Sequence, residues 1–481
     1  MKGTNEKQIM IATKWSMLAE IVAKLVAPIV NIILARLLDP TAYGVVASIT
    51  IITSFADIFT DAGFQKYVIQ KEYKNDEKLN NDSNVAFTSN FTLSLLIFLS
   101  IVLFRKPLSK AVGCPDATNA LVVASISILC TSFSSIIIAR FRRNLNFRPL
   151  FYVRAASSFI PLLVTVPLAF ALHSYWALVL GTVVQQLFIA IVLFCKSKYK
   201  PHFRFCFLEM KQMISFSLWN LLETLSIWFT GQASVFIVAN VLNVYYLGLY
   251  RTGMATINSY MAIFTSAIAP VLFSALSRNQ NDEDKFKNTV CIFQKMLALF
   301  IIPMGAGVFL YRNFVVKILL GSQWLEIANF MGLWAVISSI TIVISNVACE
   351  IYRSKGLPKI SFFLQISYLI FYIPAIYFSA RVDFKTLCLV SCFIRLLPVV
   401  LDIVVLNLVF KIDTITVVSN VWYYVIATAI MSICGIIMQR YSQNTGWNII
   451  SIIICIIVYF LFVLINPKTR KHMVELKKIK G

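Results

Sequence analysis

The chain has 481 residues, of which 59% are hydrophobic and 13% are charged, and its formal net charge is +22. A soluble chain of this length would need far more charged surface, so the composition excludes an ordinary soluble protein. The lysines and arginines gather in short connections between apolar runs, a pattern that marks the cytoplasmic side of a membrane protein. The positive charge therefore does not indicate a nucleic-acid partner.

Apolar runs long enough to cross a bilayer as a helix, about 20 residues each, recur along the chain. Both ends and the connections after even-numbered runs hold most of the lysine and arginine, which predicts that both termini are cytoplasmic. We therefore predict an all-α polytopic membrane protein of about fourteen transmembrane helices. The runs lie at 15–37, 42–61, 85–104, 118–139, 150–172, 175–195, 213–241, 245–272, 289–311, 325–349, 360–380, 384–409, 419–438 and 447–465.

The first and seventh runs resemble each other, since residues 15–44 match residues 219–248 at a constant offset. Six runs separate the start of one copy from the start of the other, so both copies cross the membrane in the same direction. Such a parallel repeat predicts two lobes that alternate between inward-open and outward-open states. The matched pairs include Trp15 with Trp219, Asp39 with Asn243 and Gly44 with Gly248.

This repeat predicts a two-lobe organisation with two extra helices after the second lobe. The predicted parts are a cytoplasmic N-terminus (1–14), an N-lobe of helices 1–6 (15–195), a cytoplasmic linker (196–212), a C-lobe of helices 7–12 (213–410), helices 13–14 (411–465) and a basic cytoplasmic tail (466–481).

The sequence holds neither a G-x-x-x-x-G-K-[ST] phosphate loop nor a Cys/His spacing typical of a metal site. Most of its ten cysteines lie inside apolar runs, where they fit as small packing residues. We therefore expect no enzyme activity, no metal and no cofactor, and coupling to protons or sodium remains open.

Charged side chains inside the predicted spans are the main candidates for function, because each costs about 2.5–3.5 kcal/mol at mid-bilayer unless it faces a cavity or a partner. Arg395 lies near the middle of its span and is the strongest of these candidates, since its side chain cannot easily reach the membrane surface. The predicted substrate-binding cations are Lys24, Arg154, Arg251 and Arg395.

Carboxylates within or near the spans are candidates for ion coupling or for pairing with these cations. Glu20 precedes Lys24 by one helical turn, and Asp402 follows Arg395 along one predicted helix face. Protonation or sodium binding changes the cost of burying such a group, so either event could switch the lobes. The candidates are Glu20, Asp57, Asp61, Glu223 and Asp402.

The stretch "RFRRNLNFRPLFYVR" concentrates five arginines between the fourth and fifth predicted spans. We attribute Arg140, Arg142 and Arg143 to the positive-inside pattern of a cytoplasmic turn. Arg148 begins the next span, and Arg154 lies about one turn inside the membrane, where it either reaches back to the surface or faces the cytoplasmic mouth of the protein.

Several motifs together resemble the polysaccharide exporters of the MATE-like multidrug/oligosaccharidyl-lipid/polysaccharide flippase superfamily. The Wzx-type branch, which includes colanic-acid and teichuronic-acid exporters, is the most similar. The order and spacing of the motifs across the predicted spans carry the resemblance. They are "ILARLLDPTAYGVVA", "FTDAGFQKYVIQKE", "FRRNLNFRPLF", "IAPVLFSALSR" and "YRSKGLPK".

The resemblance implies a flippase in the bacterial cytoplasmic membrane that moves undecaprenyl-diphosphate-linked oligosaccharide repeat units for capsule, exopolysaccharide or O-antigen synthesis. Its expected partners are that lipid-linked oligosaccharide, membrane lipids, and a polysaccharide polymerase with its chain-length machinery. For such a substrate Arg395 is the strongest candidate for a phosphate contact, since a guanidinium binds phosphate in a bidentate way, and Arg154 is a candidate to meet the incoming diphosphate. A lipid II flippase and a drug/cation antiporter of the same superfamily remain alternatives. A membrane-embedded polymerase or glycosyltransferase is more remote, because such enzymes usually need a larger outward loop or a soluble domain.

Overall fold

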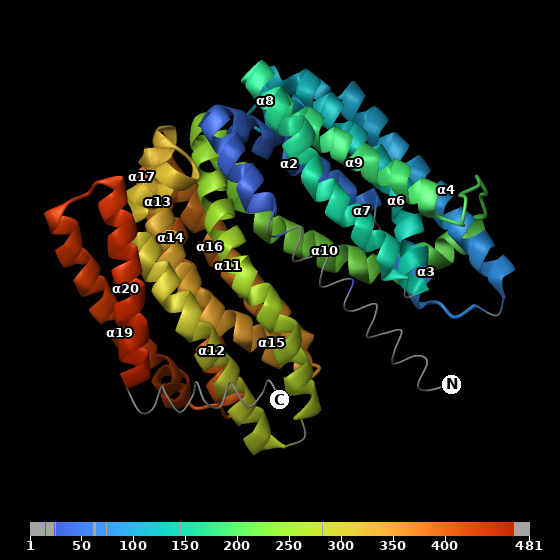
Figure 1. Ribbon diagram of the computed structural model, residues 1–481. Coiled ribbons are helices and arrows are strands. Elements are labelled where there is room, and N and C mark those ends of the chain that lie inside the picture. Colours follow the sequence, from blue (N-terminus) through green and yellow to red (C-terminus); the bar gives the residue numbers. More distant parts are fainter. Residues whose placement is uncertain are drawn as a thin grey trace. The chain divides into compact units, whose positions relative to one another are not determined.

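The computed structural model describes residues 15, 24, 26–60, 64–73, 75–144, 146–280 and 282–465, which form helices joined by short connections (Figure 1). The chain divides into two compact units, Met1–Arg251 and Thr252–Gly481. Each unit has its own packed helices.

Twelve of the described helices are long and apolar enough to cross a membrane, and each coincides with a predicted run. The prediction of an all-α polytopic membrane protein is therefore confirmed. The first predicted span is represented by the shorter apolar helix Val26–Leu37, and the eighth falls on α11 (Val244–Arg278), which is not among the twelve. The exact count of fourteen spans and the arrangement of the lobes remain predictions.

The first unit contains the helices up to the beginning of α11. Its elements are α2 (Pro40–Thr60), α3 (Phe64–Gln70), α4 (Asp76–Leu103), α5 (Arg105–Ala111), η1 (Pro115–Ala117), α6 (Thr118–Arg143), α7 (Phe147–Ile160), η2 (Pro161–Thr165), α8 (Val166–Leu172), α9 (Trp176–Lys196) and α10 (Phe207–Val241).

Helix α6 is the central helix of this unit, because it packs against α2, α3, α4, α7 and α9. It is rich in serine, yet several of these hydroxyls donate to carbonyls one turn earlier, which satisfies them without water. Asn90 of α4 donates to the hydroxyl of Ser135 over 2.6 Å in the buried interface. Small and polar side chains therefore hold these helices close together, as is typical of membrane bundles.

The two predicted repeat segments end in the same local structure. The carboxylate of Asp39 accepts from the backbone N–H of Ala42 over 2.9 Å, and the side chain of Asn243 accepts from the N–H of Tyr246 over 3.0 Å. Each residue thus caps the first turn of the next helix, α2 or α11. The matching residues Asp39 and Asn243 therefore have the same capping role in both segments.

A close helix crossing within the first unit also follows the repeat. A Cβ on Gly44 would lie 1.8 Å from the carbonyl oxygen of Val244, and a Cβ on Gly248 would lie 1.8 Å from that of Pro40. Pro40 and Val244 correspond at the offset that relates the two segments, so the contact is reciprocal. Only glycine allows the backbones of α2 and α11 to approach this closely at both positions.

The second unit contains the rest of α11 and all later helices. They are α12 (Glu283–Leu310), α13 (Arg312–Leu319), η3 (Ser322–Ile327), α14 (Ala328–Thr341), η4 (Ile342–Asn346), α15 (Val347–Ser354), α16 (Pro358–Val382), α17 (Phe384–Phe393), α18 (Leu396–Leu408), α19 (Thr414–Tyr441) and α20 (Thr445–Ile465).

The succession α4, α5, η1, α6 in the first unit recurs as α12, α13, η3, α14 in the second. The first helix has 28 residues in both cases, and it begins at a side-chain cap, Asn75 before α4 and Asp282 before α12. Each is followed by a short helix, a 3-10 turn and another long helix. In the second unit α12 also packs against α19, which pairs with α20 (Figure 1).

Candidate functional site

Arg395 lies at a break in the membrane span Phe384–Leu408, between α17 and α18. Pro398 explains the break, because its ring nitrogen cannot donate to the carbonyl of Ile394 and its ring crowds that carbonyl. The helix therefore ends at Phe393 and begins again at Leu396. The sequence thus places the arginine at an interruption inside an apolar span.

Neutral groups of α14 position the Arg395 guanidinium. Its Nη1 donates to the hydroxyl of Ser338 over 2.7 Å, and its central carbon lies 4.0 Å from the centre of the Trp334 ring. Trp334 and Ser338 are one helical turn apart and both are buried. The Trp334 indole N–H in turn donates to the side chain of Asn258 on α11 over 3.1 Å. These contacts orient the guanidinium without cancelling its charge.

Asp402 contacts a different helix from Arg395. Its side chain is buried, and it accepts a hydrogen bond of 2.9 Å from the hydroxyl of Tyr352 on α15. The sequence places Arg395 and Asp402 on one face of a continuous helix, but the break after Arg395 interrupts that face. The structure therefore gives the acid its own hydrogen-bond partner.

The other predicted cations lie on different helices. Lys24 is helical and half-buried, and Arg251 is half-buried near the beginning of α11. Arg154 is exposed on α7. Their assignment to a substrate site remains a prediction.

Of the predicted acids other than Asp402, Asp57 can be described in detail. It is half-buried on α2 and accepts a hydrogen bond of 3.1 Å from the Thr131 hydroxyl of α6. Glu223 lies on α10, but its side chain is outside the described residues, as are Glu20 and Asp61 altogether. Their role in ion coupling remains a prediction.

Arg143 holds the end of a short helix, which the sequence analysis did not anticipate. Its Nη1 donates to the carbonyl oxygens of Val68 over 3.0 Å, Ile69 over 3.0 Å and Lys71 over 2.6 Å. Its guanidinium also lies 4.6 Å from the centre of the Tyr73 ring. These carbonyls belong to the last turn of α3 and the residue after it, so Arg143 caps that helix.

A second group of contacts, next to those of Arg143, joins the connection after α3 to α4. The Lys71 ammonium lies 2.8 Å from the Asp82 carboxylate, which is fully buried, and donates to the Tyr67 hydroxyl over 2.7 Å. Partial burial lowers the pKa of Lys71, but the hydrogen bonds to Asp82 and Tyr67 raise it by more, so the net shift is upward.

Arg140, on the same turn of α6 as Arg143, has its own partner. The central carbon of its guanidinium lies 4.7 Å from the centre of the Tyr199 ring.

These contacts change the reading of the arginine-rich stretch. Arg140 and Arg143 have structural partners as well as a topological role. The signal in the sequence is Asp82, an acid beyond the first turn of an apolar helix that begins at Asp76 and therefore needs a partner.

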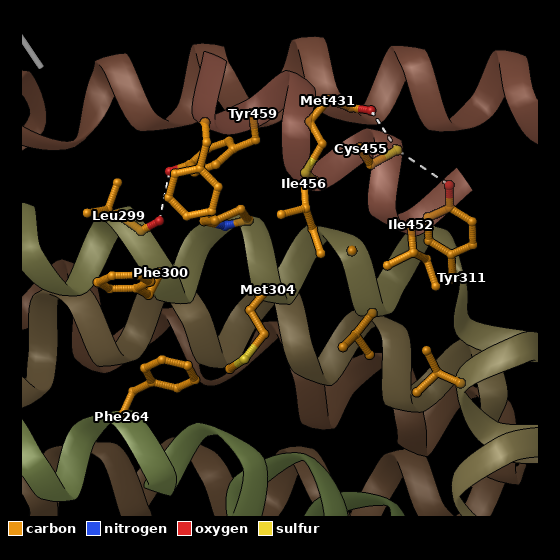
Figure 2. Close-up of a pocket in the computed structure, with 15 residues that line it drawn as sticks. Phe264, Leu299, Phe300, Met304, Tyr311, Met431, Ile452, Cys455, Ile456 and Tyr459 are labelled. Atoms are coloured by element: carbon orange, nitrogen blue, oxygen red, sulfur yellow. Dashed lines mark hydrogen bonds between the residues drawn. The ribbon is translucent and has the colours of Figure 1, made fainter. Parts of the chain in front are cut away.

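An apolar cavity of about 380 Å³ lies in the second unit, between α11, α12, α13, α19 and α20. Figure 2 shows Phe264, Phe300 and Met304 on one side and Ile452 and Ile456 of α20 on the other. Its few polar groups are bonded to protein atoms. The Tyr459 hydroxyl donates to the carbonyl of Leu299 over 2.8 Å, and Cys455 contacts the Tyr311 hydroxyl over 3.4 Å (Figure 2). The cavity therefore suits hydrocarbon.

A second hollow in this unit, of about 320 Å³, has a mixed lining of apolar and polar side chains. Its lining includes Thr265 and Ser266 of α11, Asn346 of the π-helical turn η4, and Glu350 and Arg353 of α15. The Arg353 guanidinium lies 3.0 Å from the Glu350 carboxylate. Hydroxyl, amide and charged groups in one hollow are suited to hydrogen-bonding a polyhydroxylated ligand.

The fold is that of a polytopic helical membrane protein with MATE-like architecture. The structure is similar to that of the lipid II flippase MurJ in an inward closed conformation, with a TM-score of 0.73 and 14% identity, over 94% of this chain and 98% of that one. It is also similar to an inward-facing multidrug resistance MATE family transporter of the MOP superfamily, with a TM-score of 0.57 and 11% identity, over 86% and 94% of the two chains. These likenesses establish the fold alone.

The chain belongs to the polysaccharide biosynthesis protein family, whose model matches residues 33–329. It is 22% identical over 303 residues to the succinoglycan biosynthesis transport protein ExoT of Rhizobium meliloti (strain 1021), 63% of this chain and 60% of that protein. It is 19% identical over 369 residues to the lipopolysaccharide biosynthesis protein WzxC of Escherichia coli (strain K12), 76% and 73% of the two chains. It therefore spans less than two thirds of ExoT. The predicted family resemblance is confirmed.

Proposed function

We propose that this protein is a flippase that moves polyprenyl-diphosphate-linked oligosaccharide repeat units across the bacterial cytoplasmic membrane. Family membership supports a role in polysaccharide biosynthesis, and the relatives ExoT and WzxC are named for polysaccharide transport and lipopolysaccharide biosynthesis. Such a substrate has a polar sugar head, an anionic diphosphate and a long apolar tail. Its head cannot cross hydrocarbon unaided, because its hydroxyls and charges would lose their water.

Arg395 is the observation that carries this proposal. A cation inside an apolar span is costly, and this one is fixed by an aromatic ring and a hydroxyl. An arginine held in this way is suited to a diphosphate, which offers oxygens to both guanidinium N–H edges. In this proposal Lys24, Arg154 and Arg251 meet the same anionic group at other stages of transport.

The two hollows of the second unit fit the other parts of the substrate. The apolar cavity around Phe300 and Met304 has the chemistry needed by a segment of polyprenyl tail. The second hollow, around Asn346 and Glu350, has polar groups that can bond sugar hydroxyls. No covalent step is needed for this transport, so we propose that the protein catalyses none.

Coupling, orientation and macromolecular partners complete the proposal. Glu20, Asp57, Asp61 and Glu223 are the candidates for binding a proton or sodium ion. Both termini are proposed to be cytoplasmic, and a polysaccharide polymerase on the outer side would consume the product. Cysteines introduced at Asp116 and Lys198, which are both exposed, test the orientation, because an impermeant maleimide should label only Asp116→Cys in intact cells.

The central experiment measures lipid-linked repeat units in a strain that lacks the gene. We expect them to accumulate with their sugars on the cytoplasmic face, and expression of the wild-type chain should clear them. Arg395→Gln should restore the protein in the membrane but should not clear the intermediate. Accumulated lipid II with normal polysaccharide would instead support the lipid II alternative, and no accumulation of either lipid would refute the proposal.

Arg381→Gln is a matched control for this experiment. Arg381 is also an arginine that stacks on an aromatic ring in the second unit, 4.8 Å from the centre of Tyr377, but it lies exposed at the end of α16. It should clear the intermediate normally. Equal failure of both variants would show that any loss of a stacked arginine impairs the protein, and the assignment of Arg395 to the substrate would then be withdrawn.

A further inference from the structure

A basic pocket lies at the surface of the first unit. It has a volume of about 250 Å³ and is formed by the C-terminal end of α6, by α7 from Phe147 to Ser157 and by part of α9. These three helices pack against one another, and Figure 1 shows them side by side. Arg142 of α6 and Arg154 of α7 line the pocket, so two cations reach it from different helices.

The base of this pocket is apolar and closely packed. Val153 and Leu193 form part of it, and both are buried in a packed cluster with Ile137. Phe151 and Leu150 add further apolar surface. The pocket therefore combines a cationic rim with a hydrocarbon floor, and the packing of α7 on α9 holds it open in advance.

The three arginines at the end of α6 have different environments. Arg140 stacks on Tyr199, and Arg143 binds the carbonyls at the end of α3. The side chain of Arg142 is exposed, and it makes no hydrogen bond or ion pair among the residues that the structure describes. Arg140 and Arg143 therefore stabilise contacts within the fold, whereas Arg142 lines a pocket.

The height of the pocket along the helices gives the class of ligand. Arg142 is at the last turn of the span Pro115–Arg143, and the span Phe147–Leu172 begins beside it. Lipid phosphates lie at this boundary, whereas acyl or isoprenoid chains lie below it. Basic pockets between transmembrane helices at this level recognise anionic lipid heads. Two guanidinium groups can bind one phosphate with charge-assisted hydrogen bonds, and the apolar floor can contact the chain.

From this geometry we infer that the α6–α7–α9 pocket binds a lipid through its phosphate group, with Arg142 and Arg154 as the phosphate ligands. The phosphate can come from an anionic phospholipid of the bilayer or from the polyprenyl carrier. The inference goes beyond the proposed function in the first case. In the second case it rests on that function and adds an entry site for the carrier.

Binding to the purified full chain tests this inference by native mass spectrometry after delipidation. The probes are phosphatidylglycerol, undecaprenyl phosphate and diacylglycerol, which has chains but no phosphate. For the preferred phosphate lipid, we expect R142Q/R154Q to raise the Kd on the order of tenfold for each arginine removed. Diacylglycerol binding should not change. R142K/R154K should recover part of the affinity, because lysine keeps the charge but loses the bidentate geometry.

The matched control is Arg278→Gln, which removes an exposed arginine at the end of α11. It should bind all probes like the wild type, and all variants should have wild-type melting temperatures, because the substituted side chains are exposed. Weaker phosphatidylglycerol binding alone identifies a bilayer phospholipid, and weaker undecaprenyl phosphate binding alone identifies the carrier. Weakening of both supports recognition of the phosphate itself.

Two outcomes would overturn the inference: unchanged binding of both phosphate lipids in R142Q/R154Q, or an equal loss of diacylglycerol binding. These measurements do not depend on transport. A variant that loses lipid binding while the deletion strain accumulates no intermediate would therefore refute the proposed function and leave the pocket assignment standing.

Discussion

The two units hold their arginines in contrasting ways. In the first unit Arg143 lies at the end of a membrane span, where three backbone carbonyls and the Tyr73 ring surround its guanidinium. In the second unit Arg395 lies inside a span, where it contacts the Ser338 hydroxyl and the Trp334 ring. Both arginines stack on an aromatic side chain, but Arg143 donates to backbone carbonyls at the end of α3, whereas the bond from Arg395 to Ser338 reaches a side chain.

This contrast separates a structural arginine from a candidate ligand arginine. The carbonyls at the end of α3 have no further helical N–H to accept from, so Arg143 is needed for that segment to fold in place. Arg395 contacts the side chains of Ser338 and Trp334 on α14. It lies inside an apolar span, where an anion is attracted to its charge more strongly than in water. Substitutions at the two sites should therefore affect different measurements.

The largest effect is expected from Arg143→Ala. Loss of the guanidinium leaves several carbonyls near α3 without their donor, and the expected destabilisation is about 2–4 kcal/mol. Thermal unfolding in detergent and the amount of protein in the membrane measure it. Arg142→Ala is the matched control, because Arg142 is on the same turn but exposed, and it should change stability by less than about 0.5 kcal/mol. Equal stability of the two variants would contradict a structural role for Arg143.

Arg395→Gln should have the next largest effect, and mainly on transport. Removal of a charge-assisted contact to the diphosphate should slow clearance of the lipid-linked intermediate on the order of 100-fold, which corresponds to about 2.7 kcal/mol. The protein should remain folded, because glutamine can still donate to Ser338. If Arg395→Gln destabilised the protein as much as Arg143→Ala does, the distinction between a structural arginine and a ligand arginine would be wrong.

Trp334→Leu should reduce transport less than Arg395→Gln does. Without the ring, Arg395 keeps its charge and its bond to Ser338 but loses a buried cation–π contact of about 2 kcal/mol. We expect transport to fall roughly tenfold, less than in Arg395→Gln. Initial rates of intermediate clearance measure this difference. Tyr377→Leu, which removes the stacking partner of the exposed Arg381, should transport normally.

Tyr73→Leu should have the smallest effect. It removes the ring beneath Arg143 but leaves the carbonyl contacts, so we expect a stability loss of about 0.5–1 kcal/mol and no change in transport. The shift of the melting temperature relative to the wild type measures it. If the loss matched that of Arg143→Ala, the ring and not the carbonyls would be the main partner of this arginine.

Much of the fold could be predicted because it depends on local features of the chain. Each of the twelve apolar helices coincides with a predicted run, since the thickness of the bilayer fixes the length of a span. The turn at Asp39 and its counterpart at Asn243 also follow from nearby residues, since a cap needs only a side-chain oxygen and a backbone N–H three residues later.

The candidate site was less predictable. Arg395 could be singled out as a cation within a span, but its contact with Trp334 depends on a different helix. The role of Arg143 was missed because its partners lie about 70 residues earlier in the chain, as the separations of its hydrogen bonds record. The two hollows of the second unit were also missed, since each is lined by several helices.

The sequence by itself determined the membrane class, the apolar spans and the family, because hydrophobic length and ordered motifs are properties of the chain. Tertiary structure alone decided how the charges are used. Among three arginines on the last turns of α6, packing gives Arg140 an aromatic ring and Arg143 a set of carbonyls, and leaves Arg142 at a pocket. The physical reason is that a guanidinium has the same charge and donors everywhere, so its role depends on which distant groups the fold brings to it.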